Sequence, residues 1–232
     1  MVKTTDKRFS IQLSSTQKVA AITRMPAGTT SCFVFAHGAG AGMDHPFMEA
    51  VSSGLAERRI GTLRYQFPFM ENGSKRADTP SVAHAAVRAA VAEAGRRFSG
   101  MPLFAGGKSF GGRMTSQAQA ADPLKAVLGL IFLGFPLHPA GTPSQDRAKH
   151  LLEVAIPMLF IQGTRDKLAD EPLVRSVVQG LGQRATLEVV DGADHAFHVP
   201  VRSGRTDAEV LGKVLDTVAK WATQVANARV PV

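Results

Sequence analysis

The segment Gly107-Lys108-Ser109-Phe110-Gly111 is the most informative part of this sequence. It follows the short apolar run 103–107 and precedes a segment with helical periodicity, 112–121. A serine between two glycines at such a place is typical of a sharp strand-to-helix turn, where side chains at the glycine positions would clash with the neighbouring chain. The turn would hold the Ser109 hydroxyl above the sheet, at the positive end of the following helix. The alternative is a glycine-rich turn with an incidental serine.

On both sides of this turn, short apolar runs alternate with longer amphipathic stretches. Several runs are apolar on both faces, as strands buried inside a parallel sheet must be. The predicted strands are 31–37, 62–66, 103–107, 126–134, 158–163 and 186–190, and the predicted helices are 47–58, 81–98, 112–121, 171–181 and 207–228. This alternation indicates a three-layer α/β fold, with right-handed crossovers and helices on both faces of a mostly parallel sheet.

The N-terminal part follows a different pattern. Residues 9–13 and 19–25 alternate apolar and polar side chains around the polar patch 14–17, which predicts an antiparallel hairpin at the sheet edge. The longest irregular piece, 135–143, is too short to form a cap domain. The chain of 232 residues therefore predicts a single domain, 1–232, without a cap.

Composition excludes several classes of protein. The chain has 27 Lys and Arg against 19 Asp and Glu, a formal charge of +8, but the basic residues are scattered and do not predict a nucleic-acid partner. The longest apolar run, 126–137, is shorter than the roughly 18 to 20 residues of a membrane span. The single cysteine, Cys32, excludes an internal disulfide and suits a reducing compartment. With a polar N-terminus, these features predict a cytoplasmic protein without a membrane partner.

A serine hydroxyl needs a neighbouring base before it becomes a nucleophile. Two later strand ends supply suitable groups: Asp166 follows the strand 158–163, and His195 follows the strand 186–190. In a strand–turn–helix context of this kind, the acid and the histidine come after the serine, in that order. We expect Asp166 to orient the imidazole of His195, and His195 to accept the proton of Ser109.

Other residues compete for these roles. His198 lies three positions beyond His195 and is the alternative base, and Asp170 is the alternative acid, although its position favours an N-cap of the next helix. Asp194 adjoins His195 and is better suited to a hydrogen bond within its own loop. A metal site built on these residues is not predicted, because no second cluster has ligand spacing.

Small residues follow the predicted strand 31–37 in the loop His37-Gly38-Ala39-Gly40-Ala41-Gly42. Such a loop lets backbone N–H groups approach a ligand. We predict an oxyanion hole made by the amides of Ala39 and Phe110, with Gly40 as the alternative to Ala39. A phosphate-binding loop is the competing interpretation, but the P-loop lysine and the full dinucleotide-binding spacing are absent. His37 would hold this loop by hydrogen bonding.

Two cations flank the serine. Lys108 precedes it, and Arg113 falls on the first turn of the following helix, where a cation opposes the helix dipole. We therefore expect Arg113 to pair with a carboxylate, preferably one of the protein and alternatively one of a substrate.

Taken together, the edge hairpin, the 37–42 loop, the Ser109 turn, Asp166 and His195 resemble the α/β-hydrolase superfamily. The segments 64–71, 106–113 and 134–139 look like those of a small cap-less group related to dienelactone hydrolase, with relatives among testis-expressed and chromatin-complex proteins. The resemblance implies an eight-strand, mostly parallel sheet with its site at the carboxyl ends of the strands. Dienelactone hydrolase has a cysteine nucleophile, so Ser109 argues against that particular activity.

These patterns predict a serine hydrolase, in the first place a carboxylesterase whose partner is a small-molecule acyl ester, with no metal or organic cofactor. The pocket walls should come from loops 43–48, 67–70 and 135–139, and the pocket candidates are His37, Phe47, Phe67, Phe135 and Leu137. A thioesterase, lactonase or peptidase would share this site. A non-catalytic binding protein on the same fold is the alternative from another class.

Overall fold

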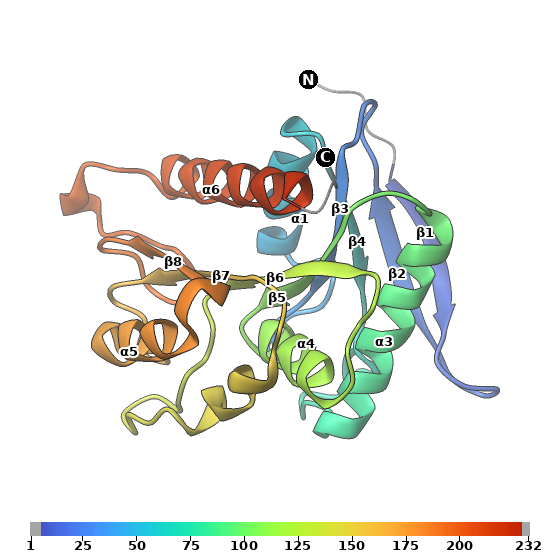
Figure 1. Cartoon of the computed structure of the whole chain (residues 1–232), viewed down its shortest axis with the longest axis horizontal. Coiled ribbons are helices and arrows are strands. Elements are labelled where there is room, and N and C mark those ends of the chain that lie inside the picture. The colour runs from blue at the N-terminus through green and yellow to red at the C-terminus, as the bar shows by residue number, and fades with distance from the viewer. Residues whose placement is uncertain (1–5, 229–232) are drawn as a thin grey trace.

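The computed structural model describes residues 6–228 and contains one eight-stranded sheet with helices on both faces (Figure 1). The strands are β1 (Asp6–Gln12), β2 (Lys18–Arg24), β3 (Ser31–Ala36), β4 (Ile60–Tyr65), β5 (Leu103–Lys108), β6 (Val127–Leu133), β7 (Met158–Gly163) and β8 (Ala185–Val190). The helices are α1 (Pro46–Glu57), α2 (Pro68–Glu71), α3 (Pro80–Arg97), α4 (Phe110–Ala121), α5 (Glu171–Leu181) and α6 (Asp207–Asn227). Short 3₁₀ segments are η1 (Asp146–Glu153), η2 (Gly182–Arg184) and η3 (Val201–Ser203).

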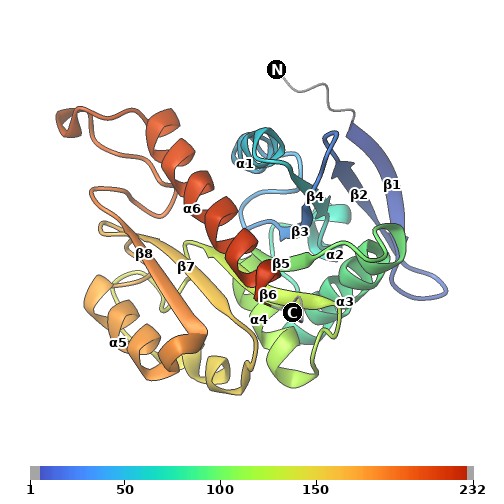
Figure 2. The same ribbon diagram turned by 45° about the horizontal axis from the view of Figure 1, so that its top comes forward.

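The strands lie in the order β1-β2-β4-β3-β5-β6-β7-β8. The β1–β2 hairpin is antiparallel and joins β4 in antiparallel register, while β4, β3 and β5 to β8 are parallel neighbours. Figure 2 shows β1 and β8 at opposite edges of the sheet. The predicted eight-strand, mostly parallel sheet with an antiparallel hairpin at its N-terminal edge is confirmed.

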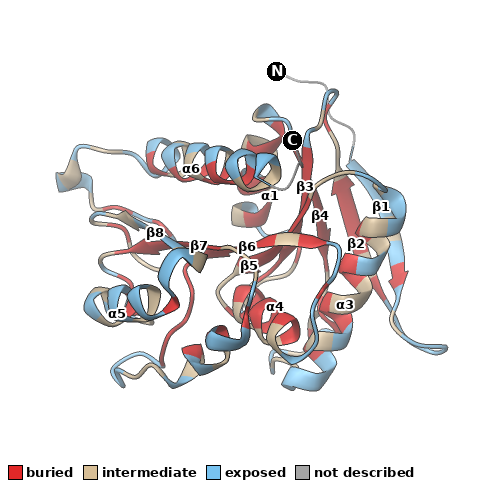
Figure 3. Cartoon of the chain, in the orientation of Figure 1, coloured by how far each residue is buried: buried red, intermediate tan, exposed pale blue. Residues whose placement is uncertain are grey.

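Apolar side chains cover both faces of the central strands, and β3, β4 and β7 are buried along their whole length. One core layer packs beneath α3, α4 and α5, and the other beneath α1 and α6. Figure 3 shows the buried residues on the sheet and on the helix faces turned toward it. This burial on two faces explains why the central strands appear in the sequence as continuous apolar runs rather than alternating ones.

The strand order reverses between β3 and β5, because β4 lies on one side of β3 and β5 to β8 lie on the other. The chain leaves β3 toward α1 on one face of the sheet and leaves β5 toward α4 on the opposite face (Figure 1). The loops after these two strands therefore diverge and leave a crevice at the carboxyl ends of the sheet.

The structure departs from the sequence-based boundaries mainly at irregular segments. Helix α4 begins at Phe110, directly after Ser109, rather than at position 112. The short helix α2 and the 3₁₀ segment η1 were not predicted, because neither is long enough to show a helical period. No helix among residues 6–228 is long and apolar enough to cross a membrane.

Candidate active site

Ser109 occupies the turn between β5 and α4 with φ 50° and ψ −117°, a conformation that is strained for a residue with a side chain. The flanking glycines permit this turn. A Cβ atom at Gly107 would lie 2.2 Å from the carbonyl oxygen of Ala36, and one at Gly111 would lie 2.5 Å from that of His37. Only a residue without a side chain fits at either place, so the backbone of β3 can approach the turn closely.

Ser109, His195 and Asp166 form a continuous hydrogen-bonded chain. The Nε2 atom of His195 lies 2.9 Å from the Oγ of Ser109, and its Nδ1 lies 2.6 Å from the Oδ2 of Asp166. The Asp166 side chain is fully buried, whereas that of His195 is 27% exposed. The Asp166 carboxylate also accepts hydrogen bonds from the Leu168 N–H, at 2.8 Å, and from the side-chain amide of Gln162. These donors hold the carboxylate in place behind the imidazole.

The alternative candidates for the base and the acid make other contacts in the structure. His198 is exposed and pairs with Asp207 at 2.8 Å, an interaction that raises the pKa of the His198 imidazole. Asp170 is the N-cap of α5, and Asp194 accepts hydrogen bonds from the backbone of its own loop. No group of three or more His, Cys, Asp or Glu within residues 6–228 has the arrangement of a metal site.

The loop after β3 lies against the serine turn. A Cβ atom at Gly38 would lie 3.8 Å from the Cβ of Ser109. His37 anchors this loop: its Nε2 accepts a hydrogen bond from the Phe67 N–H at 2.9 Å, and its Nδ1 donates to the Gly38 carbonyl at 2.7 Å. Burial lowers the pKa of His37 to about 4, so the ring is neutral and can serve in both roles. His37 therefore holds the loop by hydrogen bonding.

The two amides expected to form an oxyanion hole are available. Phe110 is the first residue of α4, so its N–H has no acceptor within the helix. The Ala39 N–H donates to no backbone acceptor in the described part of the chain. Phe110 directly follows Ser109, and Ala39 lines the same cavity as Ser109 from the adjoining loop.

Ser109 and His195 open into a cavity of about 440 Å³. The loop after β3 contributes Gly38, Ala39, Gly40 and Ala41, and the start of α1 contributes His45, Phe47 and Met48. Lys108, Leu168 and Ala196 complete the wall. The cavity is mostly apolar, and its lining within residues 6–228 includes no Asp or Glu.

The predicted pocket residues separate into two groups. Phe47 lines the cavity, whereas His37, Phe67, Phe135 and Leu137 lie in the core with at most 2% of their surface exposed. Phe67 packs edge-on against His37 and Phe110, and Phe135 packs against Phe132 and Phe160. These side chains support the loops from behind. Leu168 and Ala196, which were not predicted, follow Asp166 and His195 closely in the sequence, and that adjacency was the only available signal.

Lys108 is the other residue whose position was not foreseen. Its ammonium donates a hydrogen bond to the backbone carbonyl of His195 at 2.5 Å and lies 5.8 and 5.6 Å from the ring centres of Phe47 and Phe197. Burial lowers the pKa of Lys108 to about 8, against the opposing attraction of the Asp166 and Asp194 carboxylates. Lys108 thus ties the serine turn to the loop that carries the histidine.

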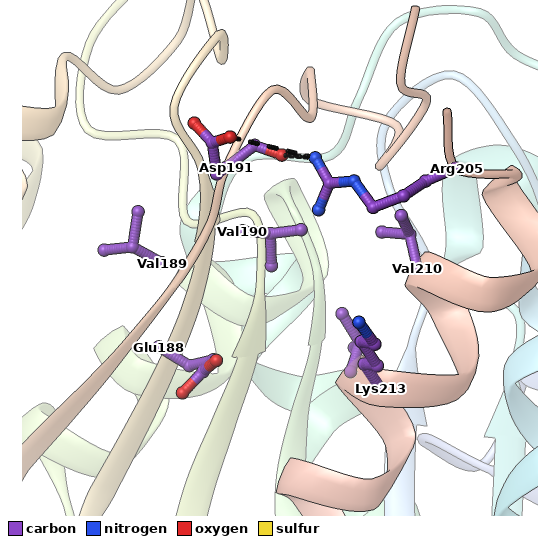
Figure 4. A pocket seen from close by; sticks show the side chains of 8 residues that line it. Glu188, Val189, Val190, Asp191, Arg205, Val210 and Lys213 are labelled. Carbon is purple, nitrogen blue, oxygen red and sulfur yellow. Dashed lines mark hydrogen bonds and ion pairs between the residues drawn. The ribbon is translucent and has the colours of Figure 1, made fainter. Parts of the chain in front are cut away.

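A second cavity, of about 190 Å³, lies between β8 and α6 (Figure 4). Arg205 closes one end of it by donating to the backbone carbonyl of Asp191 at 2.5 Å, and Glu188 and Lys213 contribute charged walls. Its lining residues, all within 6–228, include no Ser, Cys or His. Because it contains the hydrogen-bonded pair of Ser109 and His195, the cavity above Ser109 is the candidate active site.

Comparison with known proteins identifies the family. The sequence model of the family described as an alpha/beta hydrolase domain matches residues 29–223. The chain belongs to this family.

Solved structures share the fold at low sequence identity. A dienelactone hydrolase from Anabaena variabilis is 19% identical with a TM-score of 0.75, over 95% of this chain and 98% of the other. A serine hydrolase without a lid from Xanthomonas campestris is 20% identical with a TM-score of 0.72, over 93% and 94%. An esterase domain from a Rhodothermus marinus protein is 15% identical with a TM-score of 0.72, over 95% and 98%. At this identity the likeness concerns the hydrolase fold alone.

Proposed function

We propose that this protein is a serine hydrolase that works through an acyl-enzyme, and that its substrates are small, uncharged carboxylic esters. The observation that carries the proposal is the hydrogen-bonded chain from Asp166 through His195 to Ser109 at the wall of a mostly apolar cavity. A base within hydrogen-bonding reach of a strained serine, oriented by a buried carboxylate, is the arrangement that nucleophilic acyl transfer requires.

The reaction would proceed in two halves. The Nε2 atom of His195 accepts the Ser109 proton as Oγ attacks the ester carbonyl, while Asp166 accepts the Nδ1–H and stabilises the imidazolium. The amides of Ala39 and Phe110 donate to the carbonyl oxygen as it gains negative charge. His195 then protonates the departing alcohol, and a water molecule activated by the same histidine releases the acyl group. No step requires a metal or an organic cofactor.

The cavity supports the choice of substrate. Its walls are backbone and apolar side chains, with Phe47, Met48 and Leu168 facing the space beside Ser109. Its volume of about 440 Å³ lies in the range of small-molecule sites. The predictions of a cytoplasmic location and of no nucleic-acid or membrane partner belong to this proposal as well.

Active-site labelling and ester hydrolysis test the proposal together. A fluorophosphonate probe should form an adduct on Ser109, and the protein should hydrolyse p-nitrophenyl acetate and butyrate faster than longer esters. Ser109→Ala should abolish both signals with nearly unchanged thermal unfolding, while Ser81→Ala, at an exposed serine of α3, should change neither. The absence of an adduct under native conditions would instead favour a non-catalytic role.

Alanine variants of the two histidines test which of them is the catalytic base. His195→Ala should remove turnover, and His198→Ala should retain it, because His198 is exposed and pairs with Asp207 instead. Loss of activity in His198→Ala alone would overturn the assignment. A panel of thioesters, lactones and peptides against simple esters then separates an esterase from a thioesterase, a lactonase or a peptidase.

A further inference from the structure

Arg113 is a partly buried cation that pairs with no carboxylate of residues 6–228. It lies on the first turn of α4, where a positive charge opposes the helix dipole. The expected ion pair with a protein carboxylate is absent among residues 6–228, and the preference for a protein partner was therefore wrong. Its Nε atom is buried and has no hydrogen-bond partner in the part of the chain that the structure describes. A buried donor left in this state costs stability.

Six other buried or partly buried arginines have hydrogen-bond acceptors or carboxylate partners. Those that pair with carboxylates or donate to backbone carbonyls are Arg24, Arg58, Arg64, Arg88, Arg184 and Arg205. Arg113 and Arg147 are both partly buried, and neither forms an ion pair or a side-chain hydrogen bond in the described part of the chain. These two arginines therefore differ from the rest in lacking any acceptor.

The two arginines lie on α4 and η1, two segments that pack against each other. Helix α4 packs against η1, and His150 of η1 lies 2.8 Å from the Oγ of Ser116 on α4. Arg113 lies three residues before Ser116, on the same face of α4. Arg147 lies three residues before His150, and side chains three apart coincide on a 3₁₀ helix. The two arginines are thus carried by segments that pack together, and Arg147 is near enough to lower the pKa of Arg113.

The acid nearest to Arg147 in the sequence, Asp146, pairs with Lys149 and not with either arginine. Burial and the neighbouring Arg147 lower the pKa of Arg113. Burial, Arg113 and then His84 lower the pKa of His150 to about 4, so at neutral pH His150 is an uncharged ring that hydrogen-bonds Ser116. The two guanidinium groups repel each other, and no carboxylate within residues 6–228 forms an ion pair with either of them.

We propose that Arg113 and Arg147, with His150 beside them, form a binding site for a phosphate group at the junction of α4 and η1. A guanidinium presents its donors as a planar fork that matches an oxyanion. A phosphate carries about −1.5 to −2 charges at pH 7, enough to offset two guanidinium groups, whereas a carboxylate carries one. The site is separate from the Ser109 cavity, whose lining includes none of these three residues.

The test measures binding of inorganic phosphate and of phenyl phosphate to the full chain, by calorimetry and thermal unfolding, against sodium chloride and acetate at equal ionic strength. Wild type should show a saturable rise in melting temperature with phosphate that chloride does not reproduce. Arg113→Gln and Arg147→Gln should each weaken binding at least tenfold. Arg202→Gln, which removes the same charge from an exposed position of η3, should bind as wild type does.

The results test both the binding site and the identity of its ligand. A phosphate effect no larger than that of chloride, or equal binding by wild type and both variants, would overturn the site, and acetate binding as tightly as phosphate would overturn the choice of ligand. Tighter binding of phenyl phosphate points to an organic monoester, and tighter binding of inorganic phosphate points to the free ion. If Arg113→Gln fails to fold by circular dichroism, Arg147→Gln carries the comparison. Esterase activity plays no part in this readout.

Discussion

The hydrogen bond between Asp166 and His195 decides which imidazole nitrogen faces Ser109. With the proton on Nδ1 held by the carboxylate at 2.6 Å, Nε2 is left as the acceptor. Asp166→Asn offers an amide donor at the same place and favours the opposite tautomer, so kcat should fall by about 10³ to 10⁴ while the fold persists. Hydrolysis of p-nitrophenyl acetate and thermal unfolding measure the two effects. A loss of less than tenfold would contradict this role.

The free energy of unfolding should depend on pH through Lys108. Its pKa is lowered by burial from the ordinary 10.5 to about 8. Between these values the unfolded chain holds a proton that the folded protein has released, so the free energy of unfolding rises with pH, by up to about 3 kcal/mol. The contribution is complete above pH 10.5 and is lost as the pH falls through about 8.

The difference between wild type and Lys108→Met isolates this contribution, since other groups titrate in both. Denaturant unfolding at pH 7.5 and 10.5 should show wild type gaining stability relative to Lys108→Met. The control Lys220→Met, at an exposed lysine of α6, should follow wild type. A constant difference across the window would mean that Lys108 has an ordinary pKa.

The sequence predicts Ser109, Asp166 and His195 together because each directly follows a strand, and parallel strands end at the same edge of a sheet. It does not predict which loop side chains face the cavity. Phe47 at the start of α1 and Phe67 just before α2 are equally apolar, yet Phe47 lines the cavity and Phe67 packs against His37. That choice depends on contacts between loops far apart in the chain, which no local pattern encodes.

At the level of secondary-structure elements, the start of α4 depends on its close approach to β3. A Cβ atom at Gly111 would lie 2.5 Å from the His37 carbonyl oxygen and 2.7 Å from Ala36, both parts of a rigid backbone. Gly111→Ala should therefore push α4 away from β3, lower the free energy of unfolding by about 2 to 4 kcal/mol and reduce turnover sharply.

Gly212 provides the matched control for this substitution. It lies within α6, and nothing is found within 4 Å of a Cβ atom built there. Gly212→Ala should stabilise the protein by about 0.5 to 1 kcal/mol, because alanine loses less backbone entropy in a helix. Urea unfolding of both variants measures the contrast. Similar effects of the two substitutions would show that the backbone of β3 yields to Gly111→Ala.

For the whole molecule, the sequence predicts the order of strands and helices, but it does not predict the contacts that hold the edge hairpin to the rest of the sheet. Alternating strands and helices predicted the sheet, and solved structures with only 15 to 20% identity share it, because periodicity and turn residues specify this fold more than particular side chains do. The attachment of the edge hairpin involves Asp6, Glu49 and Arg64, residues of β1, α1 and β4. Such contacts between distant segments leave no periodic signal.

Arg64 contacts both other members of this group, Asp6 and Glu49. Its side chain is 1% exposed, and its Nη1 lies 2.8 Å from Glu49 and 3.2 Å from the Met43 carbonyl. Removing a partner leaves a buried charge less compensated, whereas replacing the cation by an apolar side chain removes the need for compensation. Glu49→Gln should thus lower the free energy of unfolding more than Arg64→Met does. The difference should be about 1 to 2 kcal/mol after allowing for the exposure of Glu49.

A double-mutant cycle on the two positions checks this asymmetry by urea unfolding. Once Arg64→Met is present, Glu49→Gln should cost little more, since Glu49 then keeps only its exposed side and its contact with Arg24. If Arg64→Met alone is the more costly change, the ion pairs stabilise the hairpin in their own right. The hairpin would then depend on charge rather than on the apolar face that β1 and β2 turn toward the core, and its stability would fall as salt rises.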